Sequence, residues 1–167
     1  MRTITRFFGL SIALGVMMTL LPLTTAVAAD SGCWDTKRSE RGFARKITVA
    51  RRAAGRSRLS LDPELSRAAR KHTFEMVRKD LLHHTSEPAL RRRVTNWSTL
   101  GENVGVGGTV TSLHAAFMAS PAHKDNILYK SFRHVGIGVV KRNGRMWVTV
   151  IFEAQTDPGT TLRMPRC

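Results

Sequence analysis

The sequence has few aromatic residues, few acids and only two cysteines. Aromatic residues make up 7% of the chain, and 12 acidic residues stand against 27 basic ones, for a formal net charge of +15. Sparse aromatics argue against stacking platforms for single-stranded nucleic acid, and charge without a reading motif does not predict specific nucleic-acid binding. The cysteines form neither a CxxC pair nor a cluster with histidines, which argues against a redox centre or a structural zinc site.

One long apolar run lies near the N-terminus. Arg2 and Arg6 flank its start, FFGLSIALGVMMTLLPL forms the run, and the small residues of TTAVAAD follow. This order is typical of a secretory signal peptide, and the run is short for a membrane-spanning helix. We expect cleavage after Ala28 or Ala29, with an uncleaved anchor helix as the alternative. The mature protein would be secreted, extracellular or periplasmic, and would meet a membrane only through the signal peptide.

Removal of residues 1–29 leaves residues 30–167, a normal length for one domain with a real core. It also removes Arg2 and Arg6 and no acid, so the net charge falls from +15 to +13. This charge favours anionic partners, such as a component of the cell envelope. No repeat, low-complexity tract or second domain is visible, and we expect a monomer.

Cys33 and Cys167 lie near the two ends of the mature chain. An even number of cysteines in an exported protein favours a disulfide, and this one would close nearly the entire domain into a loop. The chain-entropy model assigns such a loop about 4 to 5 kcal/mol of stabilisation. The alternative is two free or intermolecular thiols.

Helices are predicted in the first half of the mature chain. Apolar residues at helical spacing within residues 35–58 indicate a modest amphipathic helix: Phe43, Ile47 and Ala50. Asp62 suits an N-cap and Pro63 the first helical position, so a second helix begins there. Its apolar side is predicted to carry Leu65, Ala68, Ala69, His72 and Met76. On that side His72 is expected to be a partnered core residue rather than a ligand.

Shorter helices are predicted further along the chain. One starts at Pro88, a second is capped by Thr109, and a third begins at Ser120-Pro121 and places His123 in its first turn. The stretch STLGENVGVGG, residues 98–108, lies between the first two. We expect it to be a flexible glycine-rich segment that turns tightly around Glu102.

The C-terminal part changes to the period of β-strands. HVGIGVVK and MWVTVIFEA are rich in β-branched and apolar residues, and Asn143-Gly144 between them is a strong hairpin signal. Gly136 and Gly138 leave one side of the first strand bare, so a helix or another backbone should pack closely there. Helices followed by an antiparallel hairpin predict an α+β fold with helices packed on the sheet.

His84, Glu102 and His123 lie in three separate segments. Two neutral imidazoles and one carboxylate can bind zinc or another divalent ion, with a fourth position left for water. The same groups can serve as acid and base without a metal. Their spacing alone does not bring them together, and local capping and surface positions are the alternative.

Six segments in order carry a resemblance to a known family: LSLDPELSRAA, HHTS, GENVG, FMASPAHKDNIL, HVGIGVV and WVTVIF. They resemble the bacterial branch of the CAP superfamily of cysteine-rich secretory, antigen 5 and pathogenesis-related 1 proteins, over about residues 40–155. The resemblance implies a three-layer α-β-α sandwich with a small central antiparallel sheet. It also implies a cleft with two histidines and acidic residues, which holds zinc in some members. The family positions fall on His84, with His83 as the less favoured register, on Glu102 and on His123.

The sequence departs from the family pattern at two positions. Ser120 stands three residues after Phe117, where animal and plant members commonly have a second Glu, and Val150 stands where many members have Gln. A metal site can survive with His84, Glu102 and His123 alone, but a mechanism with two carboxylates loses one of them.

These features favour an exported, non-enzymatic binding module without a recognisable nucleophile. Its cleft would be lined by His84, Glu102, Ser120 and His123 and would take a divalent ion such as Zn²⁺, a small apolar ligand, or both. The alternative is a metal-dependent hydrolase in which His84 and His123 hold zinc and Glu102 is a third ligand or the catalytic base.

Overall fold

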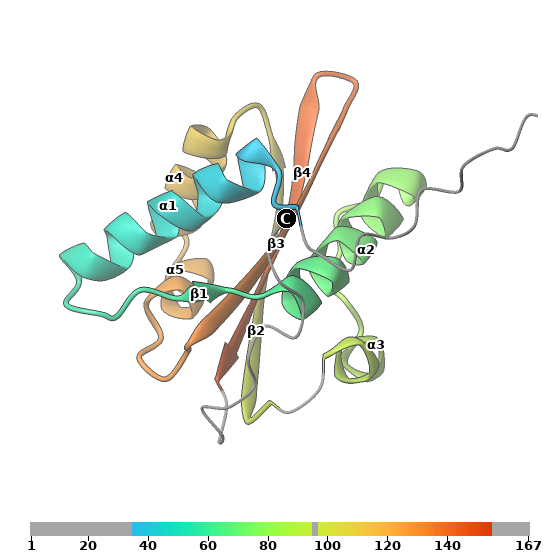
Figure 1. The fold of residues 1–167 in the computed structure, drawn as a ribbon. Coiled ribbons are helices and arrows are strands. Elements are labelled where there is room, and N and C mark those ends of the chain that lie inside the picture. The colour runs from blue at the N-terminus through green and yellow to red at the C-terminus, as the bar shows by residue number, and fades with distance from the viewer. Residues whose placement is uncertain (1–34, 95–96, 155–167) are drawn as a thin grey trace, which may run out of the picture.

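The computed structural model describes residues 35–94 and 97–154. The predicted signal peptide and both cysteines of the predicted disulfide lie outside these residues. The described chain forms helices and strands in the order α1 (Arg38–Ala53), β1 (Ser60–Leu61), α2 (Pro63–Lys79), α3 (Glu87–Arg93), β2 (Thr99–Gly107), α4 (Val110–Ala119), α5 (Pro121–Leu128), β3 (His134–Arg142) and β4 (Arg145–Ala154). Figure 1 shows the sheet between α1, α4 and α5 on one side and α2 with α3 on the other. The predicted three-layer α-β-α sandwich is therefore confirmed.

The central sheet has the strand order β1-β3-β4-β2. β3 and β4 form the predicted hairpin, in which Asn143 and Gly144 both have positive φ, as a two-residue turn of this kind requires. β2 pairs with β4 in antiparallel register, whereas β1 runs parallel to β3. The predicted antiparallel sheet is therefore formed by β2, β3 and β4, and the unpredicted two-residue edge strand β1 makes the whole sheet mixed.

The prediction for residues 98–108 was wrong. Nine of these residues, Thr99–Gly107, form β2, and Glu102 pairs with Ile151 of β4. Glycines there provide space rather than a turn, because an added Cβ at Gly105 would lie 3.0 Å from the ring of Phe117. Glu102 is consequently held on a paired strand.

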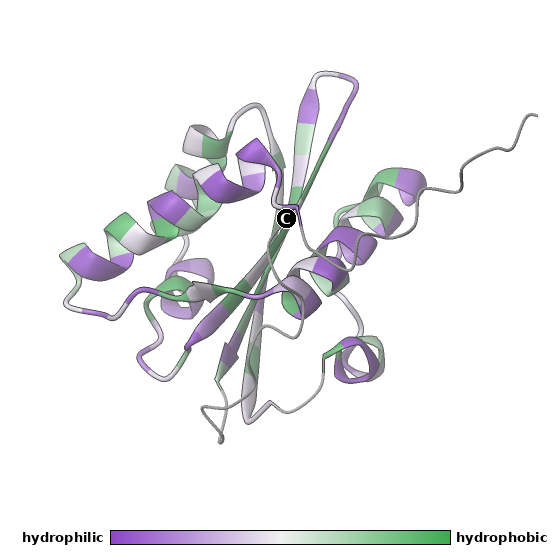
Figure 2. Cartoon of the chain, in the orientation of Figure 1, coloured by the Kyte–Doolittle hydropathy of each residue, from purple (hydrophilic) through white to green (hydrophobic). Residues whose placement is uncertain are grey.

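Buried apolar residues lie on both sides of the sheet, and the helices carry hydrophilic as well as hydrophobic residues (Figure 2). The core between the sheet and α1, α4 and α5 contains Phe43, Ile47, Leu113, Phe117, Ile127, Ile137, Val148 and Val150. The core under α2 contains Leu65, Ala68, Ala69, Val94 and Ile151 in one cluster, and Met76, Val77, Val104 and Trp147 in another. Val150, where many family members have a polar Gln, is fully buried in the first core.

α2 packs unusually close to β3, as the bare strand face predicted. A Cβ added at Gly136 would lie 2.1 Å from the carbonyl carbon of Leu65, and one at Gly138 would lie 2.4 Å from that of Ala69. Both neighbours are backbone atoms of α2, so only glycine fits at these positions. The helix is fixed at its start by the side chain of Asp62, which accepts a hydrogen bond from the Leu65 amide at 2.9 Å.

Candidate functional site

Glu102 is the centre of the candidate site. Its side chain is only 6% exposed. One carboxylate oxygen accepts hydrogen bonds from His84 Nδ1 and from the Thr85 amide, both at 2.9 Å, and the other accepts one from the Thr85 hydroxyl at 2.6 Å. The structure thus brings together His84 and Glu102, and it places His84 rather than His83 beside the carboxylate.

His84 lies in the segment between α2 and α3, and a buried histidine of α2 holds this segment in place. His72, 1% exposed, lies with Nε2 2.7 Å from the carbonyl oxygen of His83, which accepts the hydrogen bond. The other ring nitrogen of His72 lies 3.5 Å from Glu75, which also binds Arg93. His72 is therefore a partnered core residue, as predicted, and it orients the backbone next to His84.

His123 lies in the first turn of α5, as predicted. Its Nδ1 is 2.8 Å from the Ser120 hydroxyl, and its ring stacks on Phe117 with centroids 4.9 Å apart. Burial and, secondly, the charge of His84 lower the pKa of His123 below its usual value. The imidazole is therefore neutral at neutral pH, the state in which a ring nitrogen can accept a proton or bind a ligand.

Two asparagines connect the first turns of α5 to the strand that carries Glu102. Asn103 donates a hydrogen bond to the carbonyl oxygen of His123 at 2.9 Å. Asn126 donates to the backbone oxygen of Glu102 at 3.2 Å and to the Asn103 side chain at 2.9 Å. Gly101 leaves room for this contact, since an added Cβ would lie 2.7 Å from the Asn126 amide oxygen.

Sequence reasoning missed Thr85, Asn103 and Asn126 as members of the site. All three fall inside the segments that carried the family resemblance, HHTS, GENVG and SPAHKDNIL. Asn103 is fully buried, so its amide needs partners, whereas Thr85 and Asn126 are half-buried. The signal in the sequence was the position of these residues inside those segments, and it named no partner for any of them.

The donor set is smaller than a strong metal site requires. Within residues 35–94 and 97–154, no group of three His, Cys, Asp or Glu side chains lies in an arrangement that could hold a metal ion. In this part of the chain the hydrogen bonds of His84 and His123 use Nδ1, which leaves Nε2 of each ring for other partners. The described residues therefore do not form a tight three-ligand site.

The comparisons with known proteins agree with this fold. Residues 44–152 match the cysteine-rich secretory protein family, CAP. YkwD of Bacillus subtilis is 31% identical over 104 residues, which are 58% of this chain and 40% of YkwD.

Two solved structures share the fold at low sequence identity. An outer surface protein from Borrelia burgdorferi has a TM-score of 0.67 at 18% identity, over 74% of this chain and 97% of that one. NaASP2, solved with Zn²⁺, has a TM-score of 0.57 at 10% identity, over 83% and 90%. Among the described residues, no helix has the length and apolar character needed to cross a bilayer.

A mixed sheet between two helical layers, with a histidine and a glutamate hydrogen-bonded across neighbouring segments, defines a CAP-type sandwich domain. The family match covers most of the described residues. The chain belongs to the cysteine-rich secretory protein family.

Proposed function

We propose that this protein is an exported binding module that acts at the cell envelope or outside the cell and has no hydrolytic activity of its own. The site around Glu102 would receive a small ligand, and the basic surface would associate with an anionic envelope component. The name of the Borrelia burgdorferi protein states an outer-surface location for that relative, and this supports the setting.

The proposal rests on one observation: hydrogen-bond donors of the protein already engage the Glu102 carboxylate. Three hydrogen bonds from His84 and Thr85 engage both oxygens, and the side chain is nearly buried. A general base must reach the proton of a bound water or substrate, and a carboxylate already committed to three donors is poorly suited to that. Such a carboxylate instead fixes the tautomer and direction of the imidazole that it binds.

His84 and His123 would hold a transition-metal ion through Nε2, with water completing its shell. Imidazole nitrogen suits zinc or copper better than calcium. The name of NaASP2 states Zn²⁺ for that relative, and this supports testing zinc first. In this reading Glu102 orients His84 and is not a ligand, which differs from the three-ligand site expected from the residue types.

Calorimetric titration of the mature protein with Zn²⁺, without an affinity tag, tests this proposal. His84→Ala and His123→Ala should each abolish uptake, whereas Glu102→Gln should weaken it because an amide orients the imidazole less strongly than a carboxylate. His114→Gln, on α4, is the matched control and should leave uptake unchanged. Uptake that survives both alanine substitutions would refute the two-imidazole site.

The alternative function is a metal-dependent hydrolase that uses the same site. The neutral imidazole of His123 favours it, because a histidine with a lowered pKa can act as a base. Cleavage of a fluorogenic peptide library should be absent in the wild-type protein under our proposal. Cleavage that zinc stimulates and Glu102→Gln abolishes would establish the hydrolase instead.

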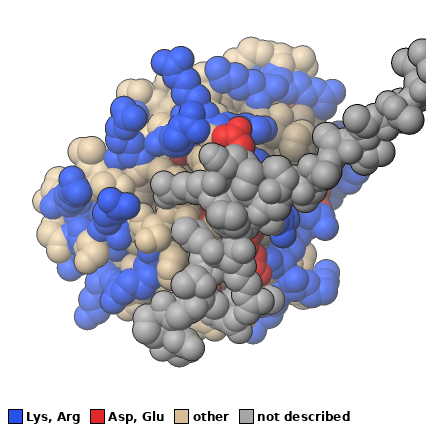
Figure 3. Space-filling view, in the orientation of Figure 1, with Lys and Arg blue, Asp and Glu red and all other residues tan. Residues whose placement is uncertain are grey.

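Association with an envelope rests on the charge of the chain. Lys and Arg side chains are distributed over the face of the molecule in Figure 3, with few acidic side chains between them. A surface of this kind attracts polyanions without a specific reading motif. The partner would therefore be recognised by its charge density.

A further inference from the structure

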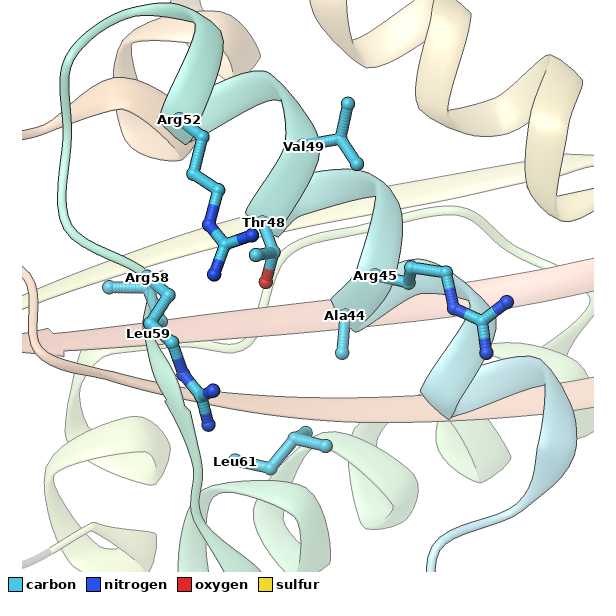
Figure 4. A pocket seen from close by; sticks show the side chains of 8 residues that line it. All are labelled: Ala44, Arg45, Thr48, Val49, Arg52, Arg58, Leu59 and Leu61. Atoms are coloured by element: carbon cyan, nitrogen blue, oxygen red, sulfur yellow. The ribbon is translucent and has the colours of Figure 1, made fainter.

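A groove lies between α1 and the segment that leads into β1, and it contains none of the residues of the histidine–glutamate site. Its cavity volume is about 300 Å³, at the lower end of the range of small-molecule sites. Figure 4 shows its lining residues, which are Ala44, Arg45, Thr48, Val49, Arg52, Arg58, Leu59 and Leu61.

Helical and strand periodicity place these residues on two facing walls. Positions i, i+3, i+4 and i+7 of α1 share one side of the helix, and they are Arg45, Thr48, Val49 and Arg52. Leu59 and Leu61 alternate along the extended segment and therefore point the same way. Val49 is 63% exposed, so the groove offers apolar surface as well as charge.

Arginines provide all the charge of the groove. Arg52 from α1 and Arg58 from the opposite wall lie at one end, and Arg45 lies at the other (Figure 4). None of the described residues that line the cavity is acidic. Arg70, Arg91 and Arg93 each bind a glutamate, whereas for the groove arginines no ion pair or side-chain hydrogen bond is found in the described part of the chain. Their positive charge is therefore left for an outside partner.

A buried arginine makes the wall that carries Arg58 rigid. Arg51 is fully buried, and it donates hydrogen bonds to the carbonyl oxygens of Ser57 at 2.7 Å, Ile127 at 2.8 Å and Tyr129 at 2.9 Å. The bond to Ser57 fixes the residue directly before Arg58. A wall that is already ordered loses little conformational entropy when a ligand binds.

We propose that this groove binds an organic phosphate with a short apolar group. A phosphate monoester carries about −1.5 to −2 charge at neutral pH and three strong acceptor oxygens, which matches two guanidinium groups. Arg52 and Arg58 would each donate two hydrogen bonds to the phosphate through their planar guanidinium groups. The Thr48 hydroxyl lies on the same side of α1 as Arg52 and could donate a further hydrogen bond. Ala44, Leu59 and Leu61 would cover the apolar group.

Calorimetry with octyl phosphate below its micelle concentration tests the site. Octyl phosphate should saturate, and three probes should each bind at least about tenfold more weakly. Inorganic phosphate lacks the apolar group, octyl glucoside lacks the anion, and octanoate has a single charge and only two acceptor oxygens for two guanidinium groups. The double variant Arg52→Gln/Arg58→Gln should lose at least about tenfold in affinity, since it removes the charge-assisted bonds. Amide chemical shifts of Ala44, Thr48 and Leu61 should move on titration.

A second double variant separates this site from a general effect of charge. Arg78 and Arg92 are exposed and lie in the last turns of α2 and α3, as Arg52 does in α1. Arg78→Gln/Arg92→Gln lowers the net charge equally and should leave octyl phosphate affinity unchanged, as should His84→Ala. Equal losses in both double variants, or octanoate and inorganic phosphate binding as tightly as octyl phosphate, would overturn the proposal.

Discussion

Replacing Gly136 with alanine should destabilise the domain more than adding one methyl group at an exposed position would. The added Cβ would lie 2.1 Å from the Leu65 carbonyl carbon and 2.3 Å from both the Leu65 Cβ and the Ser66 nitrogen. Such atoms cannot rotate away, because they belong to the first turns of α2. The helix would have to move outward by about 1 Å to bring these contacts to 3.0 Å.

The expected magnitude follows from the cost of overpacking. Inserting a methyl group into a packed core costs about 1 to 3 kcal/mol, and a clash with backbone falls at the upper end. Alanine also reduces the conformational entropy of the unfolded chain, and this offsets about 0.5 kcal/mol of that destabilisation. The net loss is about 2.5 kcal/mol, or about 10 °C in Tm for a domain of this size.

Urea unfolding followed by tryptophan fluorescence, to which the buried Trp147 (3% exposed) contributes, measures this loss. Gly108→Ala is the matched control, because nothing lies within 4 Å of its added Cβ, and it should change stability by less than about 1 kcal/mol. Gly138→Ala should resemble Gly136→Ala, and the double variant should lose less than the sum, because one outward shift of α2 relieves both clashes. A loss below about 1 kcal/mol for Gly136→Ala, or strict additivity of the pair, would refute the reasoning.

Three further predictions address the ends, the surface and the site. Thiol titration of the denatured, non-reduced mature protein should find no free sulfhydryl if Cys33 and Cys167 are paired, and two free thiols would contradict this. Binding to isolated envelopes should weaken steeply above physiological salt, where the Debye length falls below about 8 Å, and indifference to salt would remove the electrostatic argument. The lowered pKa of His123 means that its contribution to stability is complete above its ordinary pKa of 6.5 and is lost as pH falls through the folded value. His123→Gln should therefore lose less stability than the wild type between about pH 7.5 and about pH 5, and equal losses would contradict the burial of this imidazole.

Local sequence signals predicted most of the elements correctly. Asp62-Pro63, Thr109 and Ser120-Pro121 mark the starts of α2, α4 and α5, because caps and first-turn prolines act within a few residues of themselves. Asn143-Gly144 marks the hairpin for the same reason. The close approach behind Gly136 was also readable, since a strand with alternating glycines has room for another backbone.

Only the tertiary structure decided what Glu102 does. Its segment resembled a flexible loop because glycine has low strand propensity, but pairing with β4 and the packing of Phe117 against Gly105 make it a strand. The bonds from His84 and Thr85 join residues far apart in the chain, and no spacing rule encodes them. The groove between Arg52 and Arg58 likewise exists because buried Arg51 fixes one wall against the helix. Sequence alone determined the helix starts, the hairpin and the candidate histidines, because caps, prolines and turn residues act locally. Long-range packing determined that residues 99–107 form a strand and which donors Glu102 meets.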